Sequence, residues 1–148
     1  MKKALNMLAV LAITLSIVLS SCTGDSKKII GEWKGMDPKG NAVSFIFDKD
    51  HTLTLITRNE VISGKEKLVN GHRMKITYET NESAKPATLD FVFTNVDAKK
   101  ETKRIKGIFR YITDNKMELR IDLFGHTSFD TFNSEDKVHT LLLDKATN

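Results

Sequence analysis

Hydrophobic and polar residues alternate along most of the chain after residue 29, in short runs separated by turn-forming residues. In one such run, Val43, Phe45 and Phe47 fall on the same side of an extended backbone. No later stretch keeps the apolar spacing that an amphipathic helix needs over several turns. The pattern predicts an all-β domain of nine short antiparallel strands, at residues 31–36, 42–48, 51–57, 61–69, 72–79, 87–95, 104–111, 116–123 and 137–143.

Turn residues between these runs favour hairpins. Asn70-Gly71 is a strong hairpin signal, because both central positions of a type I′ turn need positive φ, and Asp114-Asn115 is read in the same way. His51 closes a third turn and tolerates the left-handed region better than a branched residue would. These connections predict an antiparallel meander that closes into an eight- to nine-stranded barrel, since closure removes exposed sheet edges. A β-sandwich is the alternative.

The N-terminus carries a different pattern. Residues 4–19 lack charge, follow Lys2 and Lys3, and are fewer than the roughly 20 residues that cross a bilayer as a helix. They predict the helix of a secretory signal and not a membrane span. The segment ends in Leu19-Ser20-Ser21-Cys22, which resembles the bacterial lipobox. That resemblance implies cleavage between Ser21 and Cys22, and a diacylglycerol and an acyl chain such as palmitate on Cys22.

The lipobox divides the chain into a signal peptide at 1–21, a polar tether at 22–28 and a β domain at 29–148. Two or more acyl chains make membrane attachment effectively permanent. Thr23 follows the cysteine, where an Asp would retain such proteins at an inner membrane in enterobacteria, so we expect a cell-envelope lipoprotein at the outer membrane. With Cys22 acylated, no thiol remains for a disulfide, a metal or a nucleophile.

Removing the 21 signal residues from 148 leaves 127, and the loss of two lysines lowers the formal charge from +4 to +2. A charge this small does not build the field of a nucleic-acid binder, so we expect no nucleic-acid partner. The basic run at 99–106 is interrupted by Glu101. We interpret it as a solvated loop and strand edge in preference to a contact with an anionic surface.

The start of the β domain resembles a second family. Gly31 and Trp33 form the Gly-x-Trp signature of the first strand of lipocalins, in which the Trp closes one end of an eight-stranded barrel. The order of segments from Tyr78 to Leu143 is similar to that of uncharacterised lipocalin-like domains of planctomycetes and other bacteria. The chain departs from that family at Phe109, usually Tyr, and at His126, usually Pro. The resemblance implies a lipocalin-like barrel and transfers no catalytic residue. Without it, Trp33 reads as a core tryptophan.

No motif predicts an enzyme, a cofactor or a metal site. The glycines at 35 and 40 lack the lysine of a phosphate loop, and Asp48-Lys49-Asp50 lacks the glycine and glutamate of a calcium loop. No two histidines have a metal-ligand spacing along the chain. Asp90, Asp122 and Asp130 could form a catalytic pair only by meeting in space, which we do not expect in a chain with 28% charged residues.

The barrel interior is the remaining candidate site. Eight-stranded barrels either fill with side chains or hold one small ligand, and Gly107 is the one clear gap among large interior residues. We expect a hydrophobic small molecule or a cell-envelope component as the ligand. The alternative is a filled barrel that acts through its loops as an envelope interaction module or an inhibitor. Aromatic residues predicted to face the interior are Phe45, Phe47, Phe91, Phe93, Phe109 and Tyr111.

Overall fold

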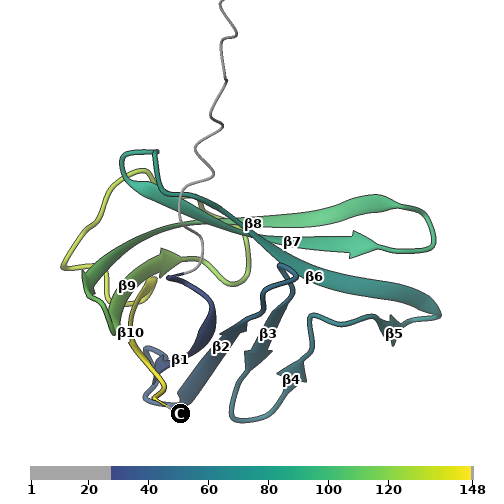
Figure 1. Cartoon of the computed structure of the whole chain (residues 1–148), viewed down its shortest axis with the longest axis horizontal. Helices are drawn as coiled ribbons and strands as arrows, with labels where there is room; N and C mark the ends of the chain where they lie inside the picture. The colour runs from purple at the N-terminus through teal and green to yellow at the C-terminus, as the bar shows by residue number, and fades with distance from the viewer. Residues whose placement is uncertain (1–27, 148) are drawn as a thin grey trace, which may run out of the picture.

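One antiparallel sheet of ten strands makes up the computed structural model, which describes residues 28–147 (Figure 1). The predicted signal helix, the Ser21–Cys22 cleavage site and the tether before Lys28 lie outside the described residues. Within residues 28–147 no helix is long and apolar enough to cross a bilayer. The strands are β1 (Gly31–Met36), β2 (Ala42–Phe47), β3 (Leu53–Ile56), β4 (Val61–Ile62), β5 (Lys67–Val69), β6 (His72–Asn81), β7 (Ala87–Asn95), β8 (Lys100–Thr113), β9 (Lys116–Ile121) and β10 (Thr140–Lys145).

The strand order is that of a meander whose first and last strands pair. Along the sheet the order is β4-β3-β2-β1-β10-β9-β8-β7-β6-β5, and the β1–β10 pairing sets Trp33 opposite Lys145. The two free edges, β4 and β5, are therefore consecutive along the chain. The all-β antiparallel fold is confirmed, and the single sheet excludes the two separate sheets of a β-sandwich.

The sheet curls into a half-barrel, and its two edges approach each other without forming a continuous ladder. An isolated bridge joins Thr52 to Thr77, and the Tyr78 N–H donates to the carbonyl of His51 at 2.9 Å. The Ile76 N–H donates to the carbonyl of Gly64, between the two edge strands. We call the segment 63–66 the seam. These few bonds tie β6 to the start of β3 across the seam.

Three expected strands differ from those observed by more than two residues at one end or are divided. The single strand expected at 61–69 is wrong, because it breaks into β4 and β5 at the seam. The last strand is β10 at 140–145 and not 137–143, because residues up to His139 belong to a preceding loop. The strand expected at 104–111 is longer, from Lys100 to Thr113. The split of the 61–69 strand gives the sheet ten strands and not eight or nine.

The three expected turns are present. Asn70 and Gly71 have φ values of 50° and 80°, as a type I′ turn requires, and His51 has a φ of 64°. Asp114 and Asn115 join β8 to β9 as expected, but neither has positive φ, so the type I′ reading fails there.

The concave face of the sheet carries the core. Phe45 packs against Phe91 with ring centroids 5.9 Å apart, and Phe47 meets the edge of Tyr78 at 5.0 Å. Gly107 leaves no gap, because a Cβ there would lie 3.0 Å from the Leu89 carbonyl oxygen and 3.1 Å from Ile121. Neighbouring groups therefore fill the gap expected from the sequence.

Strands β5 to β8 extend beyond the half-barrel as an arm, to the right in Figure 1. The turns of its two hairpins, β5–β6 and β7–β8, lie at the same end of this arm. The Val96 N–H donates to the carbonyl of Arg73 at 2.8 Å and joins the two hairpins there. The arm is thus a four-stranded projection of the same sheet.

Candidate functional site

A pocket of about 260 Å³ lies at the end of the half-barrel where β1 turns into β2. Its walls are mostly apolar, and it is more enclosed than the hollows at the opposite end. Val43, Ile121 and Leu141, which belong to the buried core, form part of its lining. The other lining residues are Asp37, Pro38, Lys39, Asp122, Leu123, Phe124, Val138 and His139.

Two large apolar side chains of this pocket are exposed to solvent. Phe124 is 77% exposed and Val138 is 68% exposed, although both line a pocket with core residues in its walls. Scattered apolar residues on a surface are ordinary, but a cluster beside a concave apolar site is typical of a place where something binds. We therefore treat this pocket as the candidate site and call it the end pocket.

The end pocket lies away from the point where the described chain begins. Strand β1 starts at Gly31, next to Lys28, and ends at Met36, next to the pocket residue Asp37. Six residues of strand cover about 20 Å at roughly 3.3 Å per residue. We call the end near Lys28 the tether end.

A tight turn holds one wall of the end pocket in place. The buried carboxylate of Asp122 accepts hydrogen bonds from the backbone N–H groups of Phe124, His126 and Thr127, at 2.9 to 3.0 Å. Burial alone would raise the pKa of Asp122, but these three donors outweigh it and hold the pKa below its ordinary value. The Lys103 ammonium also donates to the carbonyl of Phe124. The exposed Phe124 is thus carried by a fixed turn.

A long segment between β9 and β10, residues 126–139, crosses the outer side of the sheet, and we call it the strap (Figure 1). Met117, Leu119 and Ile121 of β9 point into the core, so Arg120 points outward, yet it is only 8% exposed. Its guanidinium lies 4.3 Å from the centre of the Phe129 ring and donates to the carbonyl of Thr131. The strap therefore covers this part of the outer face.

Asp136 links the strap to the end pocket. Its carboxylate accepts from Arg120 at 2.6 Å and lies 3.0 Å from Nδ1 of His139, which lines the pocket. The Arg120 guanidinium, followed by the His139 ring, lowers the pKa of Asp136 to about 2. The carboxylate thus stays ionised at neutral pH and fixes the position of the His139 ring.

The six aromatic residues predicted as ligand contacts lie in or beside the core and not in the end pocket. Four of them are at most 2% exposed, whereas Phe93 and Tyr111 are partly buried. Phe109 and Tyr111 border a shallow hollow at the tether end, together with Pro86. The six residues are Phe45, Phe47, Phe91, Phe93, Phe109 and Tyr111.

Trp33 and Gly31 lie at the tether end. The Trp33 indole is fully buried and donates from Nε1 to the carbonyl of Ile29 at 2.7 Å. Its ring lies 6.1 Å from that of Tyr111, and the Lys145 ammonium is 5.3 Å from its centre. Gly31 has a φ of 125°, a conformation that side chains rarely adopt. The indole therefore covers the core at this end.

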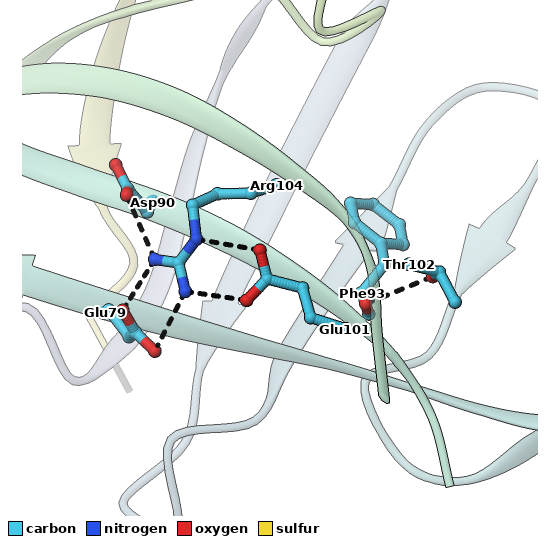
Figure 2. A network of polar contacts seen from close by, with 6 residues as sticks. All are labelled: Glu79, Asp90, Phe93, Glu101, Thr102 and Arg104. Atoms are coloured by element: carbon cyan, nitrogen blue, oxygen red, sulfur yellow. Dashed lines mark hydrogen bonds and ion pairs between the residues drawn. The ribbon is translucent and has the colours of Figure 1, made fainter. Parts of the chain in front are cut away.

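The most connected ionic group joins β6, β7 and β8 on the outer face of the sheet (Figure 2). None of its residues lines the end pocket. Arg104 forms ion pairs with Glu79, Asp90 and Glu101 at 2.6 to 3.1 Å. These carboxylates, with Glu101 first, raise the pKa of Arg104 further above its already high value. Two of the acids considered above as a catalytic pair therefore have separate partners. Asp90 pairs with Arg104, and Asp122 accepts hydrogen bonds from its own turn.

Among the described residues, no group of three or more His, Cys, Asp or Glu side chains is arranged to hold a metal ion. Searches against protein-family models, curated proteins and solved structures found no match to the chain. The lipobox and lipocalin-like resemblances therefore remain predictions from the sequence.

Sequence reasoning missed the end pocket and the strap. The pocket combines residues of the β1–β2 turn, the end of β9 and the start of β10, which lie far apart along the chain. The available signal was the pair Phe129 and Phe132, two large aromatic residues three positions apart in an otherwise polar segment. Two such rings close together carry a large apolar area, which favours packing against another part of the chain. Arg110 meets Phe132 at 4.4 Å, as Arg120 meets Phe129.

Proposed function

We propose that this protein is an exported lipoprotein, anchored in the outer membrane through acylated Cys22, whose domain binds a hydrophobic small molecule or the apolar part of a cell-envelope component. The end pocket supports this proposal, because its apolar walls are continuous with the core and its rim carries exposed Phe124 and Val138. The function is binding, without catalysis, cofactor or metal.

The anchor rests on the sequence. The positive residues at the start, the uncharged segment 4–19 and Leu19-Ser20-Ser21-Cys22 occur in the order of a lipoprotein signal. The domain begins its first strand at Gly31, nine residues after Cys22. That spacing leaves a short tether between the bilayer and the half-barrel.

We also propose that the half-barrel is a lipocalin-like barrel. Two features support this: the strand order becomes a ring once β4 and β5 are joined through the seam, and Trp33 covers one end of the core from the first strand. In this proposal the ligand enters at the opposite end and not through the aromatic interior, which is occupied by packed rings.

The size of the end pocket limits the ligand. Pockets for drug-sized ligands span roughly 300–1,000 Å³, so about 260 Å³ suits a small apolar molecule or one end of a larger amphiphile. A ligand of this kind would cover Phe124 and Val138 when bound. Burial of their exposed apolar surface would contribute about 25 cal/mol per Å².

Native mass spectrometry of the lipoprotein released from its own membranes tests the proposal. We expect an apolar molecule to remain bound beyond the covalent lipid, and the double variant Phe124→Ser, Val138→Glu to lose it. Ile112→Ser is the matched control, because Ile112 is also exposed but lies near the end of β8, outside the end pocket. A bare protein mass, or an adduct that survives the double variant, would contradict ligand binding in this pocket.

The filled core favours one alternative, an interaction module that works through its loops. The close packing around Gly107 and the aromatic contacts of Phe45 and Phe47 are what such a module requires. In that case neither the parent protein nor the double variant would carry a bound small molecule. The double variant would instead abolish a cross-link from the rim to a protein of the envelope.

A further inference from the structure

The end of the arm carries an excess of positive charge. We call residues 67–73 and 95–100 the arm tip, which comprises the two hairpin turns and the strand ends next to them. It contains four basic residues, Lys67, Arg73, Lys99 and Lys100, against one acid, Asp97. The net charge of this small region is thus +3, which exceeds the +2 of the whole chain after the signal peptide.

The acids in and beside the arm tip do not neutralise its lysines. Arg73 pairs with Asp97 at 2.7 Å and with the adjoining seam residue Glu66 at 3.2 Å. The nearby Glu101 is paired with Arg104. Among the described residues, the ammonium groups of Lys67, Lys99 and Lys100 therefore have no acidic partner.

Strand register places these lysines along one edge of the arm. Lys67 is opposite Met74, Met74 is opposite Asn95, and Asn95 is opposite Lys100. Four neighbouring strands span about 14 Å, at roughly 4.8 Å between strands. Lys99 lies next to Lys100 in the β7–β8 turn, so positive charge extends across the whole width of the arm tip.

Exposed apolar residues lie between these charges. Leu68 is 70% exposed and Val69 is 45% exposed, both on the edge strand β5. Lysines around exposed apolar side chains are typical of a surface that enters the headgroup region of a membrane, where the ammonium groups meet phosphates and the apolar groups reach the acyl boundary. A free phosphate-bearing polymer would satisfy the lysines but not Leu68 and Val69.

We propose that the arm tip is a second membrane contact, which binds the headgroups of anionic phospholipids. Each lysine near an anionic bilayer contributes about 1 kcal/mol, and this attraction falls off within a Debye length of roughly 10 Å at 0.1 M salt. The contact goes beyond the lipid anchor: the anchor fixes one end of the domain, and the arm tip fixes its orientation. Strand β8, with Lys100 at the arm tip, runs 14 residues to Thr113, near Lys28 at the tether end.

The test uses the full lipidated chain with one spin label. Ala98 is exposed in the β7–β8 turn, and Ala98→Cys supplies the only free thiol once Cys22 is acylated. The protein is reconstituted into vesicles of phosphatidylcholine alone and into vesicles that also contain phosphatidylglycerol. Accessibility of the label to a water-soluble nickel relaxation agent is then measured in both.

We expect the label to be shielded severalfold only in the vesicles with phosphatidylglycerol, and to be released at about 1 M salt, where the Debye length is about 3 Å. Lys99→Glu with Lys100→Glu should abolish the shielding. The matched control, Lys49→Glu with Lys85→Glu, changes the charge equally at two exposed lysines away from the arm tip and should retain it.

Three results would overturn the proposal. The first is equal accessibility of the spin label in both kinds of vesicle. The second is shielding of the label that survives Lys99→Glu with Lys100→Glu. The third is spin–spin broadening without anionic lipid, which would show that edge strand β5 pairs with a second copy. Flotation of the vesicles separates this failure from failure of the anchor. If the protein does not float with phosphatidylcholine vesicles, the anchor proposal fails, and adding the labelled chain to preformed vesicles still tests the arm tip.

Discussion

Gly64 lies directly against the backbone of Leu53, where the two edges of the curled sheet approach each other. A Cβ at position 64 would lie 2.2 Å from the Leu53 carbonyl oxygen and 2.6 Å from its nitrogen. Real Cβ atoms do not approach backbone so closely, so only glycine fits unless the chain moves. The seam can therefore pack against Leu53 only because residue 64 has no side chain.

Gly64→Ala should therefore push the seam away from β3. Overpacking of this kind destabilises folded proteins by about 1–3 kcal/mol. Urea unfolding followed by circular dichroism measures the loss of stability. Faster hydrogen exchange of the Ile76 N–H, which donates to the Gly64 carbonyl, would show that the seam is the part that moves. Lys65→Ala, one residue later and exposed, should change stability by less than about 0.5 kcal/mol. Equal effects of the two variants would contradict this account of the seam.

The alternation of apolar and polar residues predicts the strands that line the core, but it does not predict strand residues that are exposed on both faces. Strands β1 and β7 match the expected ranges 31–36 and 87–95, because each has one face on the core. Residues 100–103 were not expected in a strand, since the arm exposes both faces of β8 there and no alternation results. The 61–69 run reads as one strand because nothing in its pattern shows that Gly64 must leave the sheet.

The candidate site was the less predictable part. The sequence identified Trp33 and the aromatic core residues, but whether a core is packed depends on distances such as that between Gly107 and Ile121. The end pocket depends on how Pro38, Phe124 and Val138 meet in space. No pattern of apolar residues along the chain indicates that these three residues lie close together.

Trp33 should be the most sensitive single position of the tether end. Trp33→Ala removes a fully buried indole and should lower the free energy of unfolding by about 3–5 kcal/mol. Trp33→Phe keeps an aromatic ring but leaves the Ile29 carbonyl without its donor, and should cost about 1–3 kcal/mol. Chemical denaturation followed by circular dichroism separates the two. A loss below about 1 kcal/mol in Trp33→Ala would refute the role assigned to this residue.

The Arg104 group predicts a stability that depends on salt. Arg104→Met leaves Glu79, Asp90 and Glu101 close together without their shared cation, and should destabilise the domain by about 1–2 kcal/mol at low salt. Screening at about 1 M salt should reduce that difference. Arg58→Met provides the comparison, since Arg58 is exposed on the β3–β4 turn and has no acidic partner among the described residues. A loss in Arg104→Met that is the same at both salt concentrations would point to packing instead of charge.

Acid should weaken the strap through Asp136. Its pKa is about 2 in the folded protein and about 3.9 in an unfolded chain, so its contribution is complete above about pH 4 and is lost as the pH falls toward 2. Asp136→Asn should lower stability at neutral pH and should show a smaller further loss between about pH 4 and pH 2 than the parent protein. Urea midpoints at several pH values measure both. Parallel pH curves for parent and variant would exclude this role.

Cys22→Ser tests the anchor. Without the thiol no diacylglycerol can be attached, so we expect an unprocessed or soluble precursor and no incorporation of labelled palmitate. Fractionation of membranes with palmitate labelling measures both outcomes. Ser21→Ala keeps a small residue before the cysteine and should still be labelled. Lipid labelling that persists in Cys22→Ser would show that another residue carries the lipid.

The pairing of the first and last strands brings the two ends of the described chain together. The Lys145 ammonium donates to the carbonyl of Lys28 at 2.7 Å, and β10 ends beside the start of β1. A reporter fused after Thr147 would therefore lie near Lys28, at the end of the domain where the proposed tether begins. The same closeness makes circular permutation feasible: a short linker could join the two ends, and new ends could be opened in the exposed turn at Asp114 and Asn115.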